Sequence, residues 1–126
     1  MSIFKNQHTV LLIEDDAVLR TALKDEFESS DWAVLATGNV DEIPQLLTTG
    51  KPDAVVLDLI LPAQDGVSLL EEMRSAGHTF PVIILSNLAG SDSLRADAER
   101  LDAGFFNKSS VMLADVVNAL AEKLKQ

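Results

Sequence analysis

Four short apolar runs, each followed by a polar side chain, constrain most strongly how this chain can fold. Continuously apolar runs bounded by polar residues are typical of strands buried on both faces, as in a parallel sheet. The carboxyl ends of parallel strands lie along one edge of the sheet, where open α/β sheets bind their ligands. We therefore expect one site to collect the polar residues that follow these runs: Glu14, Asp15, Asp58, Ser86 and Lys108.

Segments with helical periodicity separate the runs. In the first segment, Leu19, Leu23 and Phe27 recur on one helix face, and Asp16 can cap the first turn. Strand and helix patterns alternate five times, which predicts one doubly wound α/β domain over residues 1–126 with right-handed crossovers. The expected strands are 9–14, 33–36, 54–57, 82–85 and 105–106, and the expected helices are 17–28, 41–47, 67–75, 91–101 and 110–124.

Composition narrows the classes of function. The 126 residues include 20 acidic and 10 basic side chains, a net charge of −10, whereas nucleic-acid binders present a basic face. No apolar run approaches the roughly 18 residues of a membrane span, and the N-terminus has no signal-peptide pattern. The chain has no cysteine, which excludes disulfides and thiol chemistry. We expect a cytoplasmic protein that binds neither nucleic acid nor membrane directly.

Acidic residues after the first and third strands indicate a cation site. Glu14 and Asp15 follow the first strand, and Asp58 ends the third. Carboxylates about 4 Å apart repel one another by roughly 4 kcal/mol per pair, so a fold that gathers them is stabilised by a bound cation. Mg²⁺ accepts one or two carboxylates together with water and phosphate oxygens. The alternative is that these acids only favour the positive end of the following helix, an interpretation we prefer for Asp16 alone.

Asp58 is the expected phosphoryl acceptor, since a carboxylate can attack phosphorus as a nucleophile. A Pro-x-x-Asp-Gly turn over residues 62–66 holds the backbone that follows it, so the carbonyl of Ile60 can reach the cation. Ser86 offers a hydroxyl to a phosphoryl oxygen. Lys108 offers the positive charge that a dianionic phosphoryl group requires in a partly dry site.

This set of residues resembles the receiver domain of two-component response regulators, over essentially the whole chain. The resemblance implies a flavodoxin-like fold with strand order 2-1-3-4-5 and a magnesium-dependent phosphorelay. By position, it implies an acidic pair at Glu14 and Asp15, with Asp15 a direct metal ligand, a phospho-accepting Asp58, a metal-binding carbonyl at Ile60, a switch hydroxyl at Ser86, a switch aromatic at Phe105 and the family's lysine at Lys108.

By this resemblance, a sensor histidine kinase or phosphotransfer protein donates a phosphoryl group to Asp58. The domain then switches conformation and controls a downstream protein or output domain, and it can pair as a homodimer. The chain would catalyse only its own phosphotransfer and dephosphorylation. The expected helix over 91–101 has a thin apolar stripe, Leu94, Ala98 and Leu101, which predicts weak docking and local movement of this helix.

Two of the departures from the family pattern bear on the use of phosphate. Ser109 stands where a proline with a cis peptide bond usually follows the lysine, and a cis bond before any other residue costs about 2.5–4 kcal/mol. Asn87 stands where a small residue usually follows the switch hydroxyl. These departures leave open a second interpretation, a receiver-like interaction module that does not use phosphate.

Two other classes of protein share parts of the pattern. A phosphohydrolase would also use a strand-end aspartate, but such enzymes generally need a second acid two residues later, where this chain has Ile60. A flavodoxin-like cofactor binder would share the topology, but acidic loops repel phosphate. Sustained hydrolysis of a phosphate monoester, or binding of flavin, would favour these alternatives.

Overall fold

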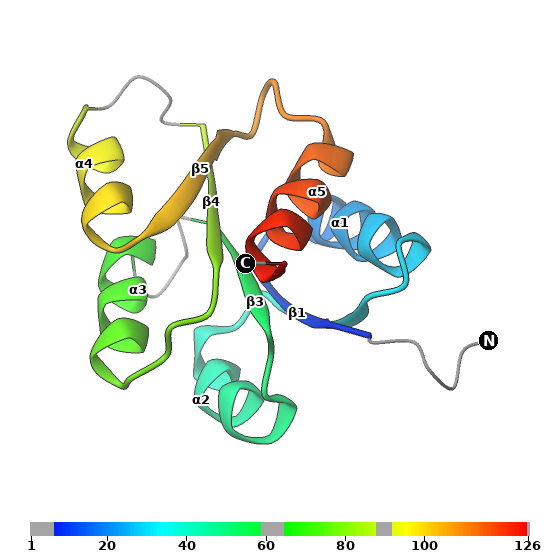
Figure 1. Cartoon of the computed structure of the whole chain (residues 1–126), viewed down its shortest axis with the longest axis horizontal. Helices are drawn as coiled ribbons and strands as arrows, with labels where there is room; N and C mark the ends of the chain where they lie inside the picture. Colours follow the sequence, from blue (N-terminus) through cyan, green and yellow to red (C-terminus); the bar gives the residue numbers. More distant parts are fainter. Residues whose placement is uncertain (1–6, 59–64, 88–91, 126) are drawn as a thin grey trace.

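A five-stranded parallel sheet forms the centre of the molecule, with helices on both of its faces (Figure 1). The computed structural model describes residues 7–58, 65–87 and 92–125. The strand order β2-β1-β3-β4-β5 confirms the predicted topology. The strands are β1 (Thr9–Ile13), β2 (Ala33–Thr37), β3 (Ala54–Asp58), β4 (Val82–Ser86) and β5 (Ala103–Asn107), and the helices are α1 (Ala17–Ser29), α2 (Ile43–Gln45), α3 (Gly66–Ser75), α4 (Asp92–Arg100) and α5 (Leu113–Leu124).

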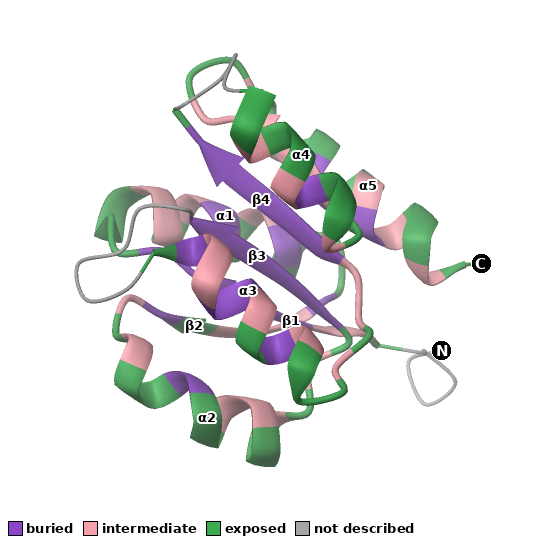
Figure 2. Cartoon of the chain, turned by 90° about the vertical axis from the view of Figure 1, so that its left-hand side faces the viewer, coloured by how far each residue is buried: buried purple, intermediate pink, exposed green. Residues whose placement is uncertain are grey.

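The strands are continuously apolar because their side chains alternate between two separate cores. Leu11 and Ile13 of β1 face one core, which they share with α2, α3 and α4. Val10 and Leu12 face the other core, which they share with α1 and α5. Both β3 and β4 are buried at every position, as Figure 2 shows in purple. Among the described helices, none is long and apolar enough to cross a lipid bilayer.

Helix α1 begins at the capped N-terminus that the sequence predicts. The Asp16 carboxylate accepts hydrogen bonds from the backbone N–H of Val18 at 2.9 Å and of Leu19 at 3.3 Å. These two groups have no partner within the first helical turn, so the cap stabilises the start of α1. Leu23 and Phe27 are buried against the sheet, which confirms the predicted apolar face of this helix.

The segment predicted as a helix over 41–47 is longer and irregular. The hydroxyls of Thr48 and Thr49 donate to backbone carbonyls four residues earlier, and such bonds compete with the regular helical ladder. Lys51 then adopts a left-handed conformation with a φ of 46°, which ends the segment. The segment comprises the 3₁₀ turn η2 (Val40–Glu42), the single turn α2 and the π-helical turn η3 (Leu46–Gly50).

Strand β5 and helix α5 differ from the predictions at their adjoining ends. β5 is longer than 105–106, because its pairing with β4 continues as far as Ser86 and Asn107. α5 begins at Leu113 rather than at residue 110, because the backbone of residues 109–111 turns around Asn107. Within α4, Ala98 is the buried residue, which agrees with the thin apolar stripe of this helix.

Asp65 caps α3, and its replacement is expected to give a small loss of stability. Its carboxylate accepts from the backbone N–H of Ser68 at 2.9 Å and from the Ser68 hydroxyl at 2.8 Å. These two bonds hold the pKa of Asp65 below its ordinary value, and the backbone bond has the larger effect. We expect Asp65→Ala to lower the free energy of unfolding by about 1 kcal/mol at neutral pH, and Asp65→Asn, which keeps an acceptor, to lower it less.

The contribution of the charged Asp65 cap has a defined dependence on pH. Because the folded-state pKa is depressed, this contribution is present above the unfolded-state pKa and is lost as pH falls through the folded-state pKa. Urea unfolding at a series of pH values should therefore show the difference between wild type and Asp65→Asn narrowing as the buffer is acidified. A difference that stays constant or widens would contradict the role of the charge.

Candidate functional site

The polar residues that follow β1, β3 and β5 lie together at the carboxyl edge of the sheet. Carboxylate oxygens of Glu14, Asp15 and Asp58 all lie within 4.8 Å of one another. The Nζ of Lys108 lies 3.0 Å from Glu14 Oε1, 3.2 Å from Glu14 Oε2 and 3.1 Å from Asp58 Oδ2. The fold thus brings these four residues into one cluster, which we call the acidic site.

Burial determines the electrostatics of the acidic site. Glu14 and Asp58 are 2% and 4% exposed. Desolvation by burial raises the pKa of Glu14 to about 7, although hydrogen bonds from the Asp16 N–H and from Lys108 oppose the shift. Burial also acts to lower the pKa of Lys108, but its hydrogen bonds to Glu14 and Asp58 outweigh burial and raise this pKa overall. Lys108 therefore remains an ammonium at neutral pH and supplies positive charge to the site.

The donor set of the acidic site suits a hard divalent cation. Three carboxylates lie together, and one ammonium contacts two of them. The Oε1 atom of Glu14 lies in the ion pair with Lys108 but, within the described part of the chain, accepts no hydrogen bond. Carboxylate oxygens are the ligands that Mg²⁺ prefers, and a cation would offset the repulsion between the acids. Ile60, whose carbonyl is predicted as a further ligand, lies outside the described residues.

The backbone of Glu14 and Asp15, which we call the acidic loop, is held by two residues whose role the sequence does not indicate. The Nη1 of Arg20, on α1, donates to the carbonyl oxygen of Glu14 at 2.7 Å and to that of Asp15 at 3.4 Å. Gly38, which follows β2, leaves room for this contact, because a Cβ there would lie 2.9 Å from Arg20 Nη1 and 3.1 Å from the Asp15 Cα. In sequence, Arg20 looks like any arginine on the outer side of an amphipathic helix.

Ser86 and Phe105 lie on neighbouring strands beside the acidic site. Ser86 ends β4 and is 1% exposed, and its carbonyl oxygen accepts from the backbone N–H of Lys108 at 3.0 Å. Phe105 is half-buried. The guanidinium of Arg95, on α4, lies over the Phe105 ring at 5.4 Å from its centroid. This cation–π contact links α4 to β5.

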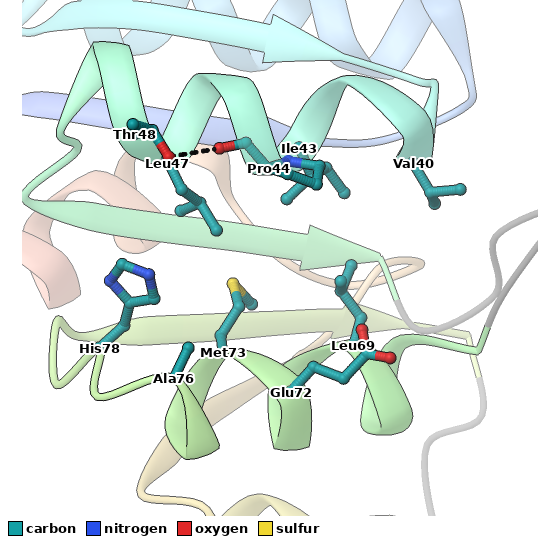
Figure 3. A pocket seen from close by; sticks show the side chains of 10 residues that line it. All are labelled: Val40, Ile43, Pro44, Leu47, Thr48, Leu69, Glu72, Met73, Ala76 and His78. Atoms are coloured by element: carbon teal, nitrogen blue, oxygen red, sulfur yellow. Dashed lines mark hydrogen bonds between the residues drawn. The ribbon is translucent and has the colours of Figure 1, made fainter.

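An apolar groove lies away from the acidic site, between the α2 segment and α3 (Figure 3). Its volume is about 330 Å³, and Ile43, Leu69 and Met73 are its buried members. Among its described lining residues, Glu72 is the one carboxylate, and no lysine or arginine is present. The groove therefore lacks the opposed charges that bind a cation and a phosphoryl group, so this chemistry belongs to the acidic site.

The fold and the acidic site are typical of one class of protein, the receiver modules of signalling systems. The chain belongs to the response regulator receiver domain family, whose model matches residues 10–119. Members of this family are signalling modules rather than enzymes with a separate substrate, and their partners are histidine kinases. The triad of Glu14, Asp15 and Asp58 is typical of the magnesium site of receiver domains.

Curated relatives of the chain are longer proteins. Response regulator MprA of Mycolicibacterium vanbaalenii is 30% identical over 95 residues, which are 75% of this chain and 40% of MprA. Virulence transcriptional regulatory protein PhoP of Salmonella choleraesuis is 38% identical over 81 residues, 64% of this chain and 36% of PhoP. The chain thus spans less than half the length of these relatives.

Solved receiver domains share the fold of the chain. The BeF3-activated N-terminal receiver domain of Klebsiella pneumoniae RstA has 25% sequence identity and a TM-score of 0.82, and the match covers 94% of this chain and 99% of that domain. A CheY-like receiver domain protein from Methanospirillum hungatei has a TM-score of 0.86 at 20% identity, with 95% of each chain covered.

Proposed function

We propose that Asp58 accepts a phosphoryl group from a phosphohistidine of a partner protein, and that the acyl phosphate switches the domain, residues 1–126, between two states. The observation that carries this proposal is the position of Lys108 Nζ, 3.1 Å from Asp58 Oδ2 and 3.0 Å from Glu14 Oε1, within a buried group of carboxylates. This arrangement supports the proposal, because it sets the carboxylate of Asp58 beside a positive charge and beside the carboxylate of Glu14.

In the proposed transfer, a carboxylate oxygen of Asp58 attacks the phosphorus atom. The P–N bond to the donor imidazole breaks, and the imidazole nitrogen takes the bonding electron pair. Lys108 compensates the negative charge on the phosphoryl oxygens, and the hydroxyl of Ser86 donates a hydrogen bond to one of them. Positioning and charge compensation account for most of the rate, because the protein performs little other covalent chemistry.

The carboxylates of Glu14, Asp15 and Asp58 and the carbonyl of Ile60 would hold Mg²⁺. When bound, the ion supplies further positive charge against the phosphoryl oxygens. The chain itself prepares the ligands for this role. Arg20 fixes the backbone that carries Glu14 and Asp15, and the burial of Glu14 and Asp58 limits the competition of water for these two carboxylates.

The proposed switch passes from Ser86 through Phe105 to α4. Movement of the Ser86 hydroxyl toward the phosphoryl group lets the ring of Phe105 follow inward, which shifts an existing equilibrium between two conformations. Arg95 lies over that ring, so a movement of the ring changes the position of α4, which has little buried surface of its own. The downstream protein or output domain reads this face, and two copies of the chain can pair through it.

Intact-mass measurement after incubation with acetyl phosphate tests the acceptor function. The expected result is a single phosphoryl adduct that requires Mg²⁺. The departures at Asn87 and Ser109 favour one alternative, the receiver-like interaction module that does not use phosphate. That alternative is supported if the chain forms no adduct and also binds no beryllofluoride in the presence of Mg²⁺.

We expect the phosphodonor protein to dock beside the acidic site, on the first turns of α1 and α5. Val18 and Met112 are 80% and 68% exposed, and they are the exposed large hydrophobic residues of the described chain. Both lie where a helix begins after the carboxyl edge of the sheet, and the two helices lie side by side (Figure 1). Exposed apolar side chains at a functional site are typical of a protein-binding surface.

Replacing Val18 and Met112 should affect transfer from a protein donor but not transfer from acetyl phosphate. The double variant Val18→Glu, Met112→Glu is expected to slow transfer from a kinase that labels the wild-type chain by about tenfold or more, as for loss of apolar anchors in an interface. Labelling by acetyl phosphate should stay at the wild-type rate, since a small donor needs no docking surface. Thr49→Glu, an exposed change on the opposite face of the sheet, is the matched control. Equal slowing with both donors would contradict docking at this surface.

A further inference from the structure

The loop after Lys108 is built around Asn107. The side-chain Oδ1 of Asn107 accepts from the backbone N–H of Ser109 at 3.0 Å and from the Ser109 hydroxyl at 2.9 Å. The backbone carbonyl of Asn107 accepts from the N–H of Ser110 at 3.2 Å and of Val111 at 3.0 Å. All three residues that follow Lys108 therefore donate to Asn107, and the chain closes into a compact turn that contains the lysine.

The sheet holds the same segment from the other side. Asn107 is the last residue of β5 and is the register partner of Ser86, and the N–H of Lys108 donates to the Ser86 carbonyl. The backbone of Lys108 is thus fixed between β4 and the Asn107 turn. A lysine side chain is a flexible four-carbon stem, so its reach to the carboxylates of Glu14 and Asp58 depends on where this backbone is held.

A hydrogen bond from Ser109 restrains the loop at the position where the family pattern has a proline. No peptide bond in the described residues is cis, and this includes the bond between Lys108 and Ser109. Ser109 carries a backbone N–H, which a proline would lack, and that N–H is one of the donors to Asn107 Oδ1. The side chain of Asn107 therefore restrains the loop at the position where the family pattern has a proline ring.

We propose that Asn107 is a positioning residue for phosphoryl transfer, which directs Lys108 toward Glu14 and Asp58 through the turn that its carboxamide oxygen closes. This inference rests on the proposed transfer to Asp58. Asn107 acts through Lys108 rather than on the phosphoryl group. Its effect is therefore expected in the rate of transfer and not in the affinity for Mg²⁺. The carboxylates that would hold the ion do not depend on Asn107, because Arg20 holds the backbone of Glu14 and Asp15 and strand β3 carries Asp58.

Rates of labelling by acetyl phosphate with Mg²⁺ test the proposal in Asn107→Ala, Asn107→Asp and Ser109→Ala. We expect Asn107→Ala to lower the rate constant at saturating donor by about tenfold or more, the scale of a small misplacement in a catalytic site, with the half-saturating Mg²⁺ concentration unchanged. Asn107→Asp keeps the acceptor oxygen and should recover most of the rate. Ser109→Ala keeps the backbone donor and should stay within about threefold of wild type, since only the hydroxyl bond is lost.

Two results would overturn the positioning role: a wild-type rate in Asn107→Ala, or a rate in Asn107→Asp as low as in Asn107→Ala. Absence of both label and beryllofluoride binding in the wild-type chain would instead refute the proposed function. A double-mutant cycle of Asn107→Ala with Lys108→Ala, read by urea unfolding, tests the positioning role without phosphate. Asn107→Ala should raise the unfolding equilibrium constant by a factor about threefold smaller when Lys108 is already absent, whereas additive effects would overturn the role.

Discussion

Asp58→Asn is expected to abolish magnesium-dependent phosphoryl labelling. The substitution removes the anionic oxygen that attacks phosphorus but keeps the size of a side chain that is buried at the end of β3. Since the amide is a very poor nucleophile, the mass of the variant should stay unmodified over the time in which the wild-type chain is fully labelled. Intact-mass spectrometry with acetyl phosphate, with and without Mg²⁺, measures this directly.

Asp53→Asn is the matched control for this experiment. Asp53 lies at the opposite end of the same strand, where its Oδ2 accepts from the backbone N–H of Thr9 at 2.8 Å, a bond that an amide oxygen can also accept. This variant should be labelled like the wild-type chain. A magnesium-dependent adduct that persists in Asp58→Asn and maps to Asp15 or Glu14 would contradict the assignment of the acceptor.

Lys108→Met is expected to affect both transfer and stability. Loss of the ammonium should slow labelling by about 10²- to 10³-fold, the typical cost of removing one charge-stabilising donor. It also leaves the buried carboxylates of Glu14 and Asp58 without the ammonium that lies 3.0 and 3.1 Å from them. Removing one partner of a buried pair costs about 3–5 kcal/mol of unfolding free energy, and we expect the lower end because the Lys108 side chain is 16% exposed.

Mg²⁺ should restore part of the stability that Lys108→Met loses, because the ion can offset the same carboxylates. Urea unfolding with and without Mg²⁺ measures both effects. Lys24→Met is the control. Among the described residues Lys24 pairs with exposed Glu28, at 3.5 Å on the surface of α1, and the substitution is expected to change the unfolding free energy by less than about 0.5 kcal/mol. A Lys108→Met chain that labels at the wild-type rate would contradict the role of the lysine.

The topology and the acidic cluster are predictable from the sequence because each has a local signal. β3 and β4 are buried on both faces, and such burial requires uninterrupted apolar residues, as in Val82–Ser86 before its serine. The polar residue after each run then falls at the carboxyl edge, and parallel pairing brings Glu14, Asp58 and Lys108 to within ion-pair distance. The Asp16 cap was predictable for the same reason, since a cap involves only neighbouring residues.

The supports of the site were not predictable, because they depend on contacts between segments that are distant in sequence. Arg20 holds the acidic loop only once α1 has packed beside β1, and the space it needs is provided by Gly38 from a different loop. No role was predicted for Asn107, although its side chain closes the turn after Lys108. That turn also delays the start of α5, which periodicity alone places at residue 110.

The ion pair between Glu14 and Lys108 joins residues that are 94 positions apart, and this separation has a consequence for biosynthesis. A chain emerging from the ribosome exposes the acids near its N-terminus long before the lysine is made. The carboxylates are therefore gathered with their counter-charge only after β5 has joined the sheet, the last strand to be synthesised. An incompletely folded domain would then be a poor phosphoryl acceptor, so that competence to receive the signal reports that the sheet of this domain has fully assembled.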